Sequence, residues 1–218
     1  VPTQTESLGE NRTAVAISAG DDHSCVILDN GSVSCMGYNA GGQLGDNSTD
    51  ERHVPTQTES LGENRTAVAI SAGNAHTCAI LDDGSVSCWG LWSRVGANTS
   101  VNSYVPIQTE SLGEDRTAVT ISAGDKAHTC AILDDGSVSC WGENDFGQLG
   151  DNSTIQRLVP TQTVAILATI FHEASRAFQT PCGLGTWQNQ TGQSSCIPAS
   201  TGYYVDTNGS TAQTPCGL

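Results

Sequence analysis

The sequence predicts an all-β protein built from three similar hairpins, each closed by a disulfide bond. The stretch Ser71–Gly90 has close copies at Ser18–Gly37 and Ser122–Gly142. Within each copy, apolar and small polar residues alternate on both sides of an Asp-Gly or Asn-Gly pair, which is the strongest short-range signal for a β-hairpin. Two cysteines recur at the same places in every copy.

The cysteine spacing determines the register of the hairpin. In the first copy, a two-residue loop at Asn30-Gly31 would leave Cys25 and Cys35 diagonal to one another. A three-residue loop over 29–31, with Gly31 in the left-handed conformation, places the two cysteines directly opposite each other. They then form a non-hydrogen-bonded pair with Cα atoms about 4.5 Å apart, which is close enough for a disulfide. The same reasoning predicts two further disulfides, Cys78–Cys88 and Cys130–Cys140.

The hairpins belong to a longer repeat. Copies begin at Val1, Val54, Val105 and Val159, so the periods are 53, 51 and 54 residues. Periods near 50 residues are typical of solenoids, propellers and arrays. We therefore expect one domain over residues 1–163, with repeats at 1–53, 54–104 and 105–158 and a stub at 159–163.

Further elements are expected around each hairpin. Val15 and Ile17 alternate with small residues, which predicts a strand before the first hairpin. A loop rich in Gly and Asn follows the hairpin over residues 37–49 and leads to Val54-Pro55, where an edge strand would fit.

Composition favours an extracellular protein. Nine cysteines in paired spacing indicate an oxidising compartment. The net charge of −15, with Lys126 as the only lysine, argues against binding to nucleic acid or to anionic membranes. Sequons of the form Asn-X-Ser/Thr are frequent, which fits a glycosylated surface. We expect glycans at several of Asn11, Asn47, Asn64, Asn98, Asn152, Asn189 and Asn208. Asn30 also lies in a sequon, but a tight turn presents it poorly.

The repeat resembles a known family at the residues just described. The pattern Ala-Gly-x-x-His-(Ser/Thr)-Cys through Cys-Trp-Gly, followed by Gly-Gln-Leu-Gly-Asp, looks like the repeat of the regulator of chromosome condensation. The resemblance covers residues 1–163 and implies blades of a β-propeller, which closes with seven repeats in that family. Family members act as nucleotide exchange factors, as enzyme inhibitors and as interaction modules. This chain has three repeats and a stub, and its second repeat replaces the Gly-Gln-Leu-Gly loop with Leu91–Asn98.

The C-terminal part of the chain has a different repeat. The segment 164–179 breaks the first pattern and is the expected junction. Thr180-Pro-Cys-Gly-Leu184 then recurs at Thr214–Leu218. Residues 180–218 resemble the small cysteine-rich modules of tumour-necrosis-factor and ephrin receptors. The resemblance implies a Cys182–Cys196 disulfide and leaves Cys216 unpaired or bonded to another chain.

The recurring histidines admit two interpretations. His23, His76 and His128 each precede a cysteine by two residues, a spacing that zinc could use. Each repeat offers only three ligands, however, and the resemblance implies that the histidine packs and hydrogen-bonds between blades. No nucleophile differs from its repeat copies, and an active site should break the repeat symmetry, so we expect no enzymatic activity.

The loops contain the remaining candidate sites. Asp46–Thr49 and Asp151–Thr154 carry oxygen ligands suited to calcium but match no defined calcium loop, so a solvated turn is the favoured interpretation. The resemblance implies that Trp89 and Trp141 pack between blades. Trp92 and Arg94, in the divergent loop, are the candidates for a contact surface.

The sequence as a whole predicts an open or partial propeller-like array of disulfide-closed hairpins with a small cysteine-rich module. Three repeats cover less than half of a seven-repeat ring, so two blade faces should be exposed, lined by residues such as Val15, Ile17 and Trp141. Large exposed apolar patches are rare on monomers. We expect an extracellular structural or adhesive module that assembles into a homo-oligomer or filament, with no cofactor. The alternative is a propeller domain that captures another extracellular protein, and guanine nucleotide exchange is a third function that the resemblance implies.

Overall fold

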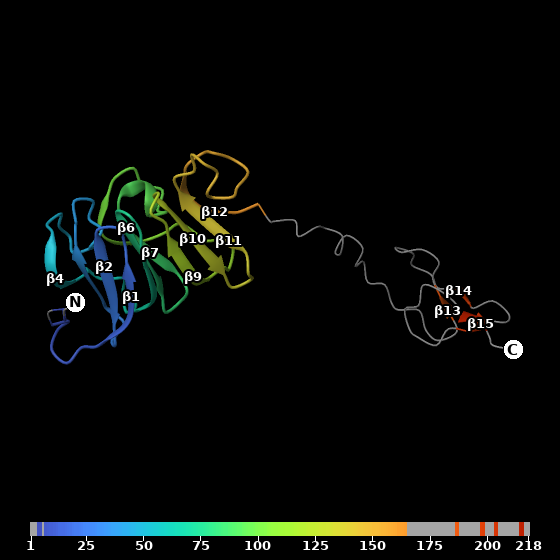
Figure 1. Ribbon diagram of the computed structural model, residues 1–218, viewed down its shortest axis with the longest axis horizontal. Helices are drawn as coiled ribbons and strands as arrows, with labels where there is room; N and C mark the ends of the chain where they lie inside the picture. Colours follow the sequence, from blue (N-terminus) through green and yellow to red (C-terminus); the bar gives the residue numbers. More distant parts are fainter. Residues whose placement is uncertain are drawn as a thin grey trace. The chain divides into compact units, whose positions relative to one another are not determined.

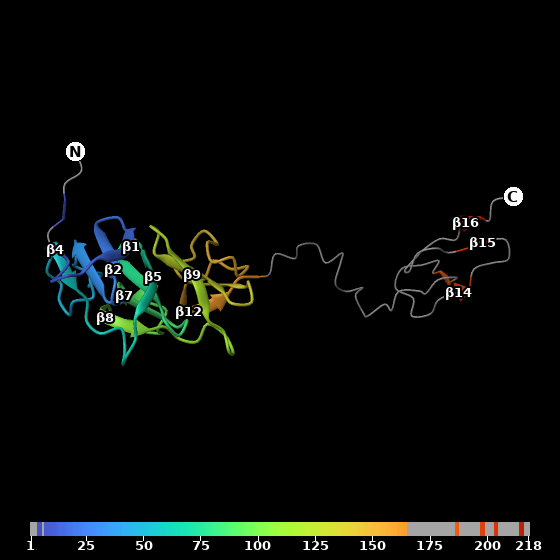
Figure 2. The same cartoon turned by 90° about the horizontal axis from the view of Figure 1, so that it is seen from below.

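The structure is a computed structural model, and it describes residues 4–5 and 7–164 together with four short strands in the C-terminal region. The chain divides into two compact units, residues 1–164 and residues 165–218. In the first unit, three four-stranded sheets follow one another along the chain (Figures 1 and 2). No helix in the described part of the chain is long and apolar enough to cross a membrane.

Each sheet is an antiparallel meander whose strands pair in chain order. We call the three sheets blades 1, 2 and 3. Blade 1 contains β1 (Ala14–Ala19), β2 (His23–Leu28), β3 (Val33–Gly37) and β4 (Arg52–Gln57). Blade 2 contains β5 (Ala67–Ala72), β6 (His76–Leu81), β7 (Val86–Gly90) and β8 (Ser103–Gln108), with the short 3₁₀ helix η1 (Trp92–Arg94) before β8. Blade 3 contains β9 (Ala118–Ala123), β10 (His128–Leu133), β11 (Val138–Gly142) and β12 (Arg157–Gln162).

The predicted hairpin register is confirmed. Cys25 lies opposite Cys35 in the pairing of β2 with β3, and the two form a disulfide with Cα atoms 4.1 Å apart. The amide of Gly31 donates to the carbonyl oxygen of Leu28, and Gly31 has φ 76°, a left-handed conformation that glycine adopts without steric cost. The same arrangement recurs in the other two blades, with disulfides Cys78–Cys88 and Cys130–Cys140.

Most of the fourth strand of each blade comes from the next sequence repeat. Val54-Pro55 lies within β4, at the edge of the sheet, as predicted. Proline is tolerated there because an edge strand needs fewer ladder donors. In the same way, residues 159–163, which begin a fourth copy of the sequence repeat, contribute most of β12 in blade 3.

The three blades pack face to face in order. The strands β1, β5 and β9 lie side by side (Figure 2), and β2 contacts β5 as β6 contacts β9. Two apolar clusters fill the two junctions. The first combines Cys25, Ile27, Val33, Cys35 and Leu44 of blade 1 with Ala67, Ala79, Leu81 and Trp89 of blade 2 and with Leu61 from the connection. The second repeats this set one blade later, with Trp141 in the place of Trp89 and Leu112 in that of Leu61.

The disulfides therefore form part of the apolar core. Cys25, Cys35, Cys78 and Cys88 are each fully buried, because a following blade covers them. In blade 3, Cys140 is 2% exposed but Cys130 is only half-buried, because no described segment packs on that side. Small domains with little apolar material depend on such covalent links for stability.

The second unit contributes only backbone pairings to the described structure. The strand β13 (Thr186–Trp187) pairs with β14 (Ile197–Pro198), and β15 (Tyr203–Tyr204) pairs with β16 (Thr214–Pro215). The predicted junction at 164–179 lies, beyond Val164, outside the described residues. So do the Cys182–Cys196 disulfide, the unpaired Cys216, and the sequons at Asn189 and Asn208.

The disulfides should differ in their rate of reduction. In dilute solution under native conditions, a phosphine reductant should open Cys130–Cys140 first, since Cys130 is half-buried whereas the other two bridges are covered. Alkylation at timed intervals followed by peptide mapping measures the order. Equal rates for the three bridges would contradict the expectation. Complete reduction should unfold the chain, seen as loss of the far-ultraviolet dichroism of the sheets.

Candidate interaction surface

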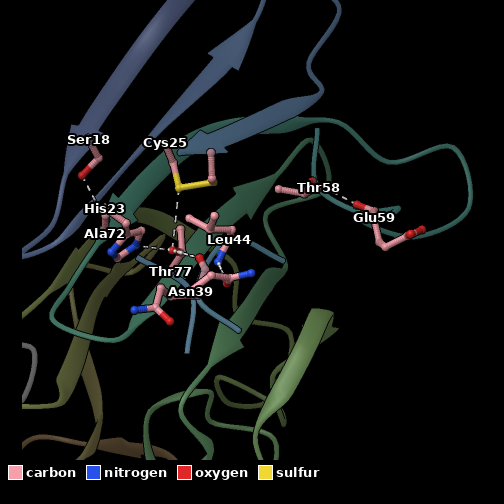
Figure 3. The surroundings of a disulfide bond; sticks show 11 residues. Ser18, His23, Cys25, Asn39, Leu44, Thr58, Glu59, Ala72 and Thr77 are labelled. Atoms are coloured by element: carbon pink, nitrogen blue, oxygen red, sulfur yellow. Dashed lines mark hydrogen bonds between the residues drawn. A yellow bond between two sulfur atoms is a disulfide. The ribbon is translucent and has the colours of Figure 1, made fainter. Parts of the chain in front are cut away.

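Each junction between blades is organised around one histidine. The imidazole Nε2 of His23 lies 2.8 Å from Thr77 Oγ1 in blade 2, and the Thr77 hydroxyl donates to the carbonyl oxygen of Gln43 at 2.8 Å (Figure 3). Because the hydroxyl proton is used in that second bond, the histidine is the donor in the first. His23 is thus protonated at Nε2. Cys25 Sγ lies 3.8 Å from the same hydroxyl, so three residues, His23, Cys25 and Gln43, converge on Thr77.

The second junction uses the same design. His76 Nε2 lies 2.8 Å from Thr129 Oγ1, and Cys78 Sγ lies 3.8 Å from it. A second polar contact accompanies each pair: the amide of Ala72 donates to Ser18 Oγ at 3.0 Å (Figure 3), and the equivalent bond joins the next two blades at 2.8 Å. The expectation that the repeated histidine packs and hydrogen-bonds between blades is confirmed for His23 and His76.

Burial lowers the pKa of both junction histidines. Desolvation lowers the pKa of His23 from 6.5 to about 4. It also lowers the pKa of His76 to about 3, with a smaller contribution from the positive charge of Arg94. Both side chains are therefore neutral at physiological pH. They serve as structural hydrogen-bonding residues between blades.

Hydrogen bonds from neighbouring side chains hold the two loop aspartates, Asp46 and Asp151. Asp46 accepts hydrogen bonds from Asn39 Nδ2 at 3.1 Å and Ser48 Oγ at 2.7 Å, and its other oxygen accepts from Arg52 Nε at 2.6 Å. Burial alone would raise the pKa of Asp46, but these hydrogen bonds outweigh it and lower the pKa. Asp151 has the same set of partners one loop later, and the hydrogen bond from Ser153 is the main cause that lowers its pKa to about 2.

These carboxylates are poor candidates for calcium ligands. An arginine already neutralises each of them, and a cation would have to displace it. Among the described residues, no group of three or more His, Cys, Asp or Glu side chains is arranged to hold a metal ion. The loop residues act as a clip that fixes the turn. The turn is not the solvated one that the sequence favoured, because the side chains of Asp46 and Asp151 are only 4% exposed.

The divergent loop of blade 2 preserves the junction despite its different sequence. Val95 and Leu44 are both fully buried, and Gly96 lies under Trp141 as Gly45 lies under Trp89. A Cβ atom at position 96 would come within 2.8 Å of the Trp141 indole nitrogen, so glycine is required there.

The predicted contact surface in this loop does not fit the structure at Arg94. The Arg94 side chain is buried at 8% exposure, its guanidinium donates to Asn74 at 3.0 Å, and its carbonyl oxygen accepts from Trp141 Nε1 at 2.9 Å. It is therefore a junction residue that a partner could not reach. The Trp92 side chain lies outside the described side chains.

At the two ends of the blade stack, some residues are exposed whose equivalents in the other blades are buried in a junction. Ile27 and Ile80 are 1% and 2% exposed, whereas the equivalent Ile132 in blade 3 is 44% exposed. At the other end, Ile17 in blade 1 is 70% exposed, whereas Ile70 and Ile121 pack against the junction clusters. We call these the open face of blade 3 and the open face of blade 1.

The predicted composition of the open faces needs correction. Trp141 does not line an open face; it is fully buried in the second junction, because each tryptophan packs toward the preceding blade. Val15 is 66% exposed, but the equivalent Val68 and Val119 are 60% and 63% exposed although both have a preceding blade. The exposure of Val15 therefore does not arise from a missing neighbour. Only Ile17 of the three residues behaves as expected.

Blade 3 differs from the other blades in one corner of the molecule. Lys126, an insertion in the turn before β10, lies over the ring of Phe146 at 5.5 Å from its centroid, a cation–π contact. Phe146 is 82% exposed and occupies the position of Gly41 in blade 1. The sequence analysis did not single out Phe146. The signal that could have identified it is the Phe at a position where the first repeat has Gly.

The junction histidines should make stability depend on pH. The unfolded chain binds a proton at each histidine near pH 6.5, but the folded chain does so only near pH 4 for His23 and pH 3 for His76. The free energy of unfolding is therefore independent of them above pH 6.5 and decreases as the pH falls toward 4, by about 1.4 kcal/mol per unit of pKa difference. The lowered pKa values of Asp46 and Asp151 contribute only below about pH 4.

Denaturant unfolding at pH 7, 5.5 and 4.5 measures this effect. The variant His76→Gln keeps a donor for Thr129 but does not titrate, so its stability should depend less on pH than that of the native chain. His53→Gln, at an exposed position of β4, is the matched control and should leave the pH dependence unchanged. An unchanged pH dependence in His76→Gln would show that the buried histidine does not govern it.

Known proteins share the fold and the repeat. Two descriptions of the regulator of chromosome condensation (RCC1) repeat match the chain, one over residues 30–80 and 135–170 and the other over 14–43, 67–96 and 118–148. The ultraviolet-B receptor UVR8 of Arabidopsis thaliana is 28% identical over 162 residues, covering 73% of this chain and 36% of the receptor. The probable E3 ubiquitin-protein ligase HERC4 of Homo sapiens is 33% identical over 175 residues, covering 79% of this chain and 16% of the ligase.

Solved structures agree with the blade arrangement. Yeast RCC1 (Prp20) bound to Kap60 superposes with a TM-score of 0.59 at 19% identity over 71% of this chain and 38% of that chain. The crystal structure of Prp20p from Saccharomyces cerevisiae gives a TM-score of 0.61 at 18% identity, over 71% of this chain and 39% of that chain. The chain thus spans well under half the length of these relatives. The matched patterns end at residue 170, so the resemblance of residues 180–218 to receptor modules stays a prediction. The repeats, the three blades and their junctions together show that the chain belongs to the family of RCC1 repeat proteins.

Proposed function

We propose that this chain is a non-catalytic assembly module of an extracellular structure, in which its open blade faces are buried against other blades. The observation that carries the proposal is the contrast between Ile132, at 44% exposure, and its buried equivalents Ile27 and Ile80. A residue that is core in two blades and exposed in the third marks a surface suited to a further blade. Exposed apolar surface of this kind is typical of interaction sites.

The chemistry of the blades supports a structural role. His23 and His76 are used in junction hydrogen bonds, and the repeated aspartates of the loops, Asp46 and Asp151, are bonded to arginines. These residues, the most reactive types in the repeat, hold the blades in place. This chain spans well under half the length of the relatives named above, so their activities are not assigned to it.

The covalent features support an extracellular location. Three disulfides lie inside the blades, and an oxidising compartment is where such bonds persist. The sequon residues Asn11, Asn47, Asn64, Asn98 and Asn152 are all exposed, and each has φ between 52° and 60°. Asparagine is one of the few residues that tolerates this left-handed turn conformation.

Protein capture is a second candidate function, and one observation favours it. Phe146 and Lys126 break the symmetry of the blades and form an exposed aromatic and cationic corner on an otherwise acidic chain. A dedicated binding site is expected at such a departure from the repeat. The substitution Phe146→Ser should weaken capture of a partner without changing self-association if this function holds.

Sedimentation velocity over a range of concentrations tests the assembly function. We expect species larger than the 22.6 kDa chain at micromolar concentration, in a distribution that shifts upward with concentration. A single 22.6 kDa species at every concentration would refute self-assembly and leave protein capture as the function to examine.

Glycan mapping tests the extracellular part of the proposal. In a secretory eukaryotic host, we expect glycans at several of the five exposed sequons. Asn30 should remain bare because its side-chain oxygen accepts from Ser32 N at 3.1 Å and from Ser32 Oγ at 2.8 Å. Asp115 has the backbone conformation of Asn64 but lacks the amide, so Asp115→Asn should create one additional site. A secreted chain with the mass of the bare polypeptide would contradict the proposal.

A further inference from the structure

We infer that blade 3 carries a socket for a tryptophan, and for the threonine paired with it, on a β-hairpin of another protein. The inference rests on the proposed function, in which this face is buried against another blade, and it names the side chains that the face takes. It is drawn from the two junctions inside the chain, where the equivalent sockets are filled.

Each internal junction seats a tryptophan on a glycine of the preceding blade. A Cβ atom at Gly45 would come within 2.8 Å of the Trp89 indole nitrogen, and a Cβ atom at Gly96 within 2.8 Å of that of Trp141. Both glycines have positive φ, 71° and 70°, and both tryptophans are fully buried. The indole ring therefore occupies the space that a side chain at the glycine position would need.

A threonine accompanies each of these tryptophans on the neighbouring strand. Thr77 lies opposite Trp89 in the pairing of β6 with β7, and Thr129 lies opposite Trp141 in the pairing of β10 with β11. The two threonine hydroxyls contact the histidines of the preceding blades. Each junction thus binds a threonine and a tryptophan that one antiparallel hairpin presents side by side.

The third glycine of this kind, Gly150, has no tryptophan over it among the described residues. Its φ is 64°, and the nearest described atom to a Cβ atom placed there is 3.5 Å away, on Thr163. An open pocket of about 690 Å³ lies beside it. We call this pocket the indole socket, and it is lined by Gly147, Gly150, Asn152, Ser153, Thr154 and Val164.

Two backbone groups at the indole socket lack the partners that their equivalents have. The amide of Asn47 donates to the outer strand of blade 2 at 2.9 Å, whereas the equivalent amide of Asn152 donates to no described residue. The carbonyl oxygen of Arg94 accepts from Trp141 Nε1, whereas that of Gln148, at the same loop position, accepts from no described residue. The socket therefore offers an acceptor for an indole N–H and a donor for the carbonyl oxygen of an adjacent strand.

The rest of the open face of blade 3 suits the paired threonine. His128 occupies the position of His23 and His76, and its imidazole forms no hydrogen bond with the described residues. Ile132 is 44% exposed, and Cys130 is half-buried. A hairpin laid on this face would give His128 a hydroxyl partner and would cover the disulfide, as the following blade does in both internal junctions.

A second copy of this chain does not offer the fitting hairpin among its described residues. Trp89 and Trp141 are fully buried in their own junctions. Blade 1 presents Ser24 opposite Met36, and methionine has no N–H to donate. Residues 165–218 contain no copy of the Cys-Trp-Gly hairpin. The occupant that fits the socket is therefore a threonine-tryptophan hairpin of a different protein.

A synthetic hairpin added to the full chain tests the inference. The probe has the sequence of residues 76–90, is closed by a disulfide between its two cysteines, and carries a fluorine on its indole ring. We expect its fluorine resonance to shift and broaden when the chain is added. An unlabelled peptide with Trp89→Met should compete about tenfold less well than the unlabelled native peptide, because the aromatic anchor is lost. A peptide with Thr77→Val should also compete less well, since His128 then finds no hydroxyl.

Two matched variants of the chain locate the site. Asparagine tolerates positive φ, so Gly150→Asn should keep the loop conformation while its side chain fills the indole socket, and the probe should bind about tenfold more weakly. Gly136→Asn makes the same change at φ 82°, with no described atom within 4 Å of the added Cβ. It lies in the turn between β10 and β11, at the opposite end of these strands, and should leave binding unchanged. Circular dichroism verifies that both variants are folded.

The outcomes separate this inference from the proposed function. If the chain self-associates in sedimentation but does not bind the probe, or binds it equally well after Gly150→Asn, the socket is overturned and assembly stands. If the chain stays monomeric and the probe binds the native chain but not Gly150→Asn, the socket is supported and self-assembly is refuted. A monomeric chain that does not bind the probe overturns both.

Discussion

The hydrogen bond from a histidine of one blade to a threonine of the next is the interaction on which the whole stack depends. It requires a dry junction, because a hydrogen bond is stronger where the local dielectric is low. Burial also keeps the imidazole neutral well below its usual pKa. The disulfide beside it helps to provide that dryness, since Cys25 and Cys35 are part of the apolar cluster. The tryptophan and leucine from the following blade complete the cover. A single blade has no neighbour to pair with its histidine or to cover its disulfide. The stability of the stack therefore arises between blades as much as within them.

The repeat pattern predicted the interior of each blade more accurately than its boundaries or faces. Cysteine spacing gave the correct hairpin register because a disulfide permits only one alignment of the two strands. The edge strand at Val54-Pro55 followed from the restriction on proline in sheets. The direction in which Trp141 packs did not follow, because both sides of a strand in a propeller are covered and alternation alone does not show which neighbour covers which side.

The divergent loop shows a second limit of reading a sequence by motif. Leu91–Asn98 lacks the family pattern and suggested a surface, yet Val95 and Gly96 reproduce the packing of Leu44 and Gly45. The sequence did contain a signal for this likeness: in both loops a glycine is followed two residues later by an asparagine. Asn47 and Asn98 both adopt positive φ, and the backbone amide of each donates to the outer strand of the next blade. Arg94 is held in the junction by two hydrogen bonds, since its backbone carbonyl accepts from Trp141 and its guanidinium donates to Asn74.

The offset between sequence repeat and blade has a consequence for how such chains change in length. Each blade closes with a strand supplied by the following repeat, as β4 does for blade 1. If one whole period is duplicated or deleted, every blade therefore still receives a fourth strand, whichever residue of the period marks the end of the duplicated or deleted segment. The number of blades can change by recombination without leaving an incomplete sheet inside the array. An array of this construction can vary in length between related genes while every internal junction stays the same.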